Sequence, residues 1–118
     1  MVRAMDQIAA ALVALIGVVH VAVGSRVFVE PTERGVWFLS AGLLLILIGL
    51  INLCRARAPV RFRLLTVTAL CGALAIVVLG ALIAASSPAL LAQPQTVVLL
   101  AIGLVLTSLS GRDLFRNS

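Results

Sequence analysis

Four long apolar stretches alternate along this chain with short segments that hold nearly all of its charged residues. The stretches cover residues 7–24, 36–53, 64–85 and 94–111. Each is close to the roughly 20 residues that an α-helix needs to cross a hydrocarbon core of about 30 Å. Because lipid offers the backbone no hydrogen-bond partner, such stretches must be helical. The sequence therefore predicts an all-α integral membrane protein that crosses the bilayer four times.

Very little of the chain lies outside these stretches. It has 118 residues, 63% of them hydrophobic, which leaves no room for a soluble domain. We expect a single transmembrane domain over residues 1–118. The loops are short, so consecutive helices should be antiparallel neighbours in a four-helix bundle.

The ends of the helices have local signals. Thr32 is suited to cap the second helix, and Glu33 places a negative charge at its positive end. Pro59 and Pro94 are predicted to lie in the first turns of the third and fourth helices, where the missing N–H of proline costs no hydrogen bond.

The arginines predict the orientation of the chain. All nine basic residues are arginines, and seven of them flank the spans on one side of the membrane: Arg3, Arg55, Arg57, Arg61, Arg63, Arg112 and Arg116. The other side carries only Arg26 and Arg34, next to Glu30 and Glu33. The positive-inside rule then places both termini and the middle loop in the cytoplasm. Since orientation accounts for the net charge of +5, nucleic acid is not an expected partner.

Small residues recur at intervals that place them on one face of each helix. Glycines lie seven residues apart at Gly17 and Gly24, and again at Gly35, Gly42 and Gly49. Gly80 and Gly103 are predicted to serve the third and fourth helices in the same way. Helices in lipid associate through close backbone contact over small residues, and this interval favours left-handed crossings near +20°. We interpret these glycines as packing positions.

His20 is the only histidine and the only ionisable residue well inside a span. It lies one turn from Gly17 and Gly24, so it should face the interior of the bundle. Ionisable groups within a membrane often mark function, although a neutral imidazole near the boundary can also be purely structural. Both interpretations remain open.

Two other polar groups are candidate ligand-binding positions. Arg26, Glu30, Glu33 and Arg34 could form a polar mouth with His20 at the outer surface, or simply a loop that neutralises its own charge. Asn52 lies one turn from Gly49, at a depth similar to Thr66 and Thr107. It should contribute interhelical hydrogen bonds, or else form the floor of a small pocket.

Between these polar layers, the predicted inward positions are apolar: Val13, Gly17, Leu45, Ala73, Ile76 and Gly103. A water-filled ion path needs lining oxygens or charges, so one through a single copy of the chain is not expected. The serine, histidine and glutamate near the outer surface match no nucleophile motif. We expect no catalytic residues, no metal site and no cofactor.

Residues 12–53 resemble small bacterial four-helix membrane proteins grouped as a family of unknown function. The resemblance rests on His20 with Gly24, on Gly35-Val36-Trp37-Phe38 leading to Gly42, and on Asn52. It implies a location in a bacterial inner membrane, and it brings no known activity or catalytic residue. The chain does not resemble small multidrug exporters, which place a glutamate where Ala14 and Leu15 stand here.

These features favour a non-enzymatic protein that binds membrane lipid, a small hydrophobic ligand or a membrane protein partner. One alternative is a homodimeric small-molecule transporter with His20 near the shared pathway. A further alternative is a haem or metal site in which two copies of His20 meet across a dimer axis.

Overall fold

The computed structural model of this chain describes residues 1–116. Four long helices account for most of them: α1 (Val2–Val27), α2 (Glu33–Arg57), α3 (Arg63–Ser86) and α4 (Pro94–Phe115). A short 3-10 helix, η1 (Pro88–Ala92), joins α3 to α4, and the described residues form no strand. All four long helices are long and apolar enough to cross a membrane. The prediction of four helices with the length and apolar composition to span a membrane is confirmed, and each helix extends by one or more residues past at least one predicted boundary.

Three of the four predicted start signals, Thr32, Glu33 and Pro94, lie where they were expected. The Gly35 N–H donates to Thr32 Oγ1 at 3.1 Å, which caps α2, and Pro94 is the first residue of α4. The prediction for Pro59 is wrong, because Pro59 lies in the loop between α2 and α3. This loop needs several residues to redirect the chain before α3 begins at Arg63.

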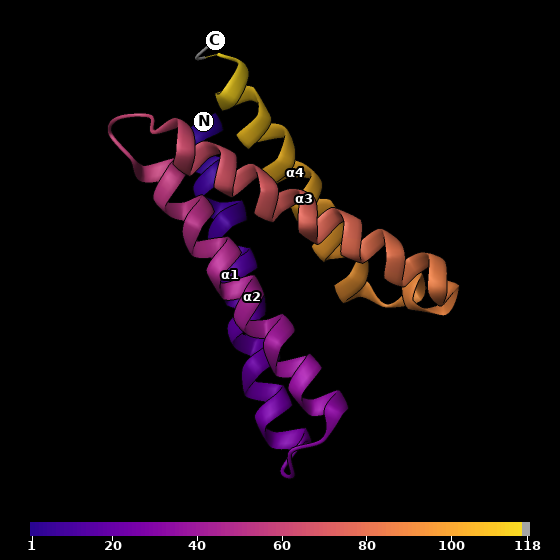
Figure 1. Cartoon of the computed structure of the whole chain (residues 1–118). Helices are drawn as coiled ribbons and strands as arrows, with labels where there is room; N and C mark the ends of the chain where they lie inside the picture. The colour runs from indigo at the N-terminus through magenta and orange to yellow at the C-terminus, as the bar shows by residue number, and fades with distance from the viewer. Residues whose placement is uncertain (117–118) are drawn as a thin grey trace.

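The helices form two antiparallel hairpins, α1–α2 and α3–α4 (Figure 1). The hairpins meet at the end that carries both termini and the α2–α3 loop, which we call the arginine-rich end because seven arginines gather there. Toward the opposite end they diverge (Figure 1). The bundle is therefore closed at one end and open at the other, an arrangement that no local sequence pattern indicated.

Glycines bring α1 and α2 into close backbone contact. A Cβ atom on Gly17 would lie 2.7 Å from the Gly42 carbonyl oxygen, and one on Gly49 would lie 2.5 Å from the Ala14 backbone nitrogen. Only residues without a side chain allow the two helices to lie this close. All seven glycines predicted as packing positions are buried: Gly17, Gly24, Gly35, Gly42, Gly49, Gly80 and Gly103.

The core lies along the centre of the closed part of the bundle. It includes Val13, Leu45, Ile76 and Leu106, and all six residues predicted to fill the apolar middle are buried. Many large apolar side chains instead point outward, including Leu15, Leu47 and Leu82, each more than half exposed. Exposed leucines on every helix suit a lipid environment, where they face acyl chains rather than water.

Candidate functional site

The divergence of the hairpins leaves an apolar cavity of about 620 Å³ between them. Its walls come from both hairpins, with Ile16 and Leu45 on one side and Ile76, Leu79 and Leu100 on the other. Cavities between helices and of this volume are typical of sites for small molecules. The cavity extends from Arg34 and Trp37, near the start of α2, inward to Ile48.

His20 lines this cavity, and its imidazole stacks on the ring of Phe38. The ring centroids are 3.7 Å apart and the planes differ by 13°. Phe38 in turn contacts Phe28, with ring centroids 5.6 Å apart. His20 is therefore partly exposed to the cavity between the hairpins, and one face of its ring is covered by Phe38 from α2.

The candidate residues of the α1–α2 turn divide into two groups. Arg34 lines the cavity, whereas Arg26, Glu30 and Glu33 are exposed and lie outside it. Within residues 1–116, no ion pair links Arg34 to an acidic side chain. Of the predicted polar mouth, the structure thus brings only Arg34 and His20 together at the cavity.

Asn52 lies apart from these residues, fully buried on the other side of the core. Its amide nitrogen donates to the carbonyl oxygens of Ile48 (3.0 Å) and Ala69 (3.4 Å), and its amide oxygen accepts from the Ser110 hydroxyl at 3.2 Å. One side chain thereby links α2, α3 and α4. The hydrogen-bonding partner is Ser110 and not Thr107, whose hydroxyl has no partner among the described residues.

A buried ion-pair network closes the arginine-rich end. Arg55 donates from Nη2 to Asp6 and from Nη1 to Asp113, each at 2.5 Å, so one guanidinium joins α1, α2 and α4. The Arg55 side chain is only 3% exposed. The sequence predicted that Arg55 flanks the second span, in the loop that follows it. Instead, α2 continues past the apolar stretch to Arg57, and Arg55 is buried.

The same end is reinforced by Arg3. Its Nε donates to the Ala56 carbonyl oxygen at 3.0 Å, and its Nη2 donates to the Arg57 carbonyl oxygen at 3.2 Å. These are carbonyls at the C-terminus of α2 that lack partners within the helix, where a positive charge is favourable.

Sequence analysis missed the role of Asp113. A detectable signal was that Asp6 and Asp113 are the only acidic residues predicted on the arginine-rich side.

Two contacts that metal binding or serine chemistry would use do not occur among the described residues. No three His, Cys, Asp or Glu side chains among them lie close enough together to hold a metal ion. The Ser25 hydroxyl donates to the Ala22 carbonyl of its own helix at 2.9 Å rather than to His20. The cavity offers mostly apolar surface and one cationic side chain, that of Arg34.

Comparison with protein-family models, with curated proteins and with solved structures finds no significant match for this chain.

Proposed function

We propose that this chain is a multi-pass membrane protein that binds one amphiphilic ligand, a lipid or a small hydrophobic molecule with an anionic group, between its two hairpins. The observation that carries the proposal is the apolar cavity of about 620 Å³ with Arg34 at its rim. Apolar side chains from both hairpins would cover the hydrophobic part of the ligand. Arg34, with no acidic partner in residues 1–116, would face its anionic group.

The position of His20 fits the same ligand. Its ring and that of Phe38 form a stacked pair that lines the same cavity as Arg34. Stacked aromatic rings give a large contact surface with little loss of side-chain freedom on binding. In this proposal His20 shapes the cavity near the anionic group of the ligand and performs no catalysis.

The distribution of arginines supports an orientation for this site. With seven arginines at the closed end, the positive-inside rule places that end in the cytoplasm. The cavity would then open toward the outer leaflet of a bacterial inner membrane. A ligand could enter sideways from lipid, because the walls diverge in that direction (Figure 1).

A homodimeric transporter is the second candidate, and one observation favours it. The cavity is open at one end of the molecule, while the Asn52–Ser110 hydrogen bond and the Arg55 ion pairs close the other. One-sided access is expected of a transporter at rest. In liposomes, transport predicts that His20→Ala abolishes flux without loss of the fold. Unchanged flux would remove His20 from the pathway.

Native mass spectrometry of the protein released gently from its own membrane tests the binding proposal. We expect a discrete bound mass with an acidic group. Arg34→Gln should reduce its occupancy severalfold, whereas Arg26→Gln, which removes a charge from the same turn but outside the cavity, should not. Equal loss in both variants would show a diffuse charge effect and contradict the assignment of Arg34.

A further inference from the structure

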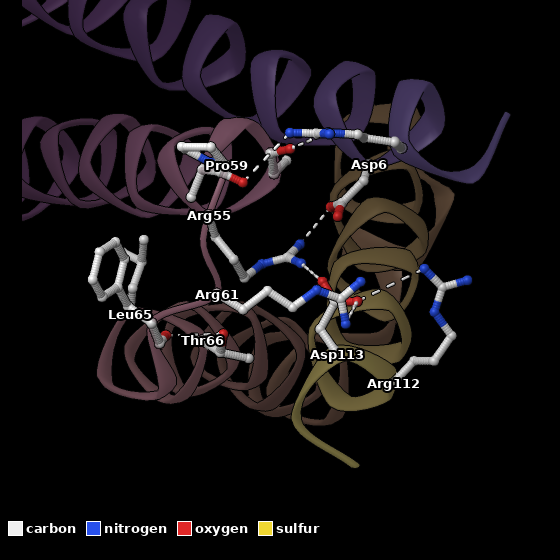
Figure 2. A pocket seen from close by; sticks show the side chains of 12 residues that line it. Asp6, Arg55, Pro59, Arg61, Leu65, Thr66, Arg112 and Asp113 are labelled. Carbon is white, nitrogen blue, oxygen red and sulfur yellow. Dashed lines mark hydrogen bonds and ion pairs between the residues drawn. The ribbon is translucent and has the colours of Figure 1, made fainter. Parts of the chain in front are cut away.

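A second, polar cavity of about 300 Å³ lies at the arginine-rich end, beneath the α2–α3 loop (Figure 2). Its charged lining consists of Arg3, Asp6, Arg55, Arg61, Arg112 and Asp113. Four arginines and two aspartates give the lining a net charge of +2. Charged side chains from three helices and the loop converge on this space (Figure 2).

Several hydrogen-bond donors in this cavity are unused. The Arg55 side chain is only 3% exposed, and its Nε has no acceptor among the described residues. A buried N–H without an acceptor costs free energy, so an acceptor that reached Arg55 Nε would be stabilised by it. Arg61 and Arg112 lie 3.6 and 3.8 Å from Asp113, too far for hydrogen bonds. Their guanidinium groups therefore remain free to donate.

The start of α3 lies on the same wall, where the Thr66 N–H already donates to the Phe62 carbonyl oxygen at 3.0 Å. Phe62, the N-cap residue of α3, offers no side-chain cap, and Phe62, Leu65 and Thr66 all line the cavity. The first-turn N–H groups of an uncapped helix and its positive dipole end together favour an anion. Here they act together with the orphaned Arg55 Nε and the arginines that surround it.

We propose that this cavity binds a phosphomonoester group. Such a group carries a charge of about −1.5 to −2 near neutral pH, which matches the lining, together with three strong acceptor oxygens. Arginine pairs well with phosphate because its planar N–H groups can bind two oxygens at once. A phosphodiester carries one charge fewer and should bind more weakly. The group can belong to a lipid such as phosphatidate or to free inorganic phosphate.

The two sources are separated by titrating dioctanoyl phosphatidate and inorganic phosphate, each alone, into the full-length protein in neutral detergent, with native mass spectrometry as the readout. Dioctanoyl phosphatidylglycerol serves as the diester control. We expect saturable binding of one phosphatidate, and binding of phosphatidylglycerol that is weaker by about tenfold, since a charged hydrogen bond is lost. Inorganic phosphate binding as tightly as phosphatidate would assign the site to the soluble ion and would also support it.

Arg61→Gln is the test variant, because Arg61 is about half exposed and forms no hydrogen bond through its side chain in residues 1–116. It should weaken phosphatidate binding by about tenfold or more. Arg57→Gln removes the same charge at the same end but outside the cavity, so it should leave binding unchanged. Equal weakening in both variants, or no binding of either probe, would overturn the proposal. Ala41→Trp fills the apolar cavity between the hairpins. Unchanged phosphatidate binding in this variant would show that phosphatidate binds in the polar cavity and not in the apolar one.

Discussion

The guanidinium of Arg55, in the last turns of α2, donates a 2.5 Å hydrogen bond to the carboxylate of Asp6, which lies 49 positions earlier in α1. Both side chains are almost completely buried, at 3% and 6% exposure. Through the second bond of Arg55 to Asp113, the pair also holds α4. The Arg55–Asp6 pair lies within the α1–α2 hairpin, and the Arg55–Asp113 pair joins the two hairpins at the end where they meet.

Removing one partner of this network should destabilise the fold. Asp6→Ala leaves a buried guanidinium with fewer acceptors, which costs about 3 kcal/mol or more in free energy of unfolding. Reversible unfolding in mixed detergent micelles measures the change. Glu30→Ala removes an exposed acid that has no ion pair in residues 1–116, and it should change stability by less than about 0.5 kcal/mol. Similar effects of the two variants would show that the Arg55–Asp6 pair does not stabilise the fold.

Gly49→Ala tests the close contact between α1 and α2. The added methyl group would lie 2.5 Å from the Ala14 backbone nitrogen, so the helices must separate. We expect a loss of about 1–3 kcal/mol, seen as a lower melting temperature in detergent. Gly111→Ala is the control, because a Cβ there meets no atom within 4 Å. It should leave the melting temperature unchanged or raise it, and a fall equal to that of Gly49→Ala would contradict the packing.

Gly49 and the Asp6–Arg55 contact show what a single sequence can and cannot predict. Gly49, Val13 and Ile76 were assigned inward positions because helical periodicity is local and needs only neighbouring residues. The Asp6–Arg55 contact depends on which helix ends meet and on how far α2 continues beyond its apolar stretch. Neither property is encoded in periodicity. The predicted left-handed crossings and cytoplasmic termini remain predictions.

The sequence did not predict the cavity either. The spacing of His20 to Gly17 and Gly24 predicted that it faces the interior of the bundle, and in the structure it is partly exposed and lines the cavity. Its stacking on Phe38 depends on the register between α1 and α2, and the cavity that it lines together with Arg34 depends on how the two hairpins diverge (Figure 1). Neither property is local in the sequence. Arg26, Glu30, Glu33 and Arg34 are adjacent in sequence, yet only Arg34 lines the cavity.

The hydrogen bond between Asn52 and Ser110 predicts a non-additive pair of variants. Ser110→Ala alone leaves the buried Asn52 amide oxygen without its donor and should cost about 1–3 kcal/mol. Adding Asn52→Leu removes the orphaned acceptor, so the double variant should be more stable than the sum of the single changes predicts. A double-mutant cycle of unfolding free energies measures this coupling. Strict additivity would exclude the hydrogen bond as a stabilising contact.

His20 can be tested by separating its shape from its basicity. His20→Phe keeps an aromatic ring against Phe38, whereas His20→Ala removes a stack worth about 0.5–1.5 kcal/mol. If the ring only shapes the cavity, His20→Phe should retain both the melting temperature and the bound ligand, and His20→Ala should lower both. Loss of ligand in His20→Phe with an unchanged melting temperature would instead assign the binding to the imidazole nitrogens.

The most direct test of a ligand between the hairpins is to fill the cavity and look for the bound mass. Ala41 lines the cavity, and Ala101 is exposed at a similar distance from the start of its own helix but outside the cavity. Native mass spectra of Ala41→Trp and Ala101→Trp, released from the same membrane as the unmodified chain, provide the comparison. We predict a bound mass in the unmodified chain and in Ala101→Trp, and its loss in Ala41→Trp. A bare unmodified chain, or an Ala41→Trp variant that keeps the bound mass, would contradict the proposed binding site.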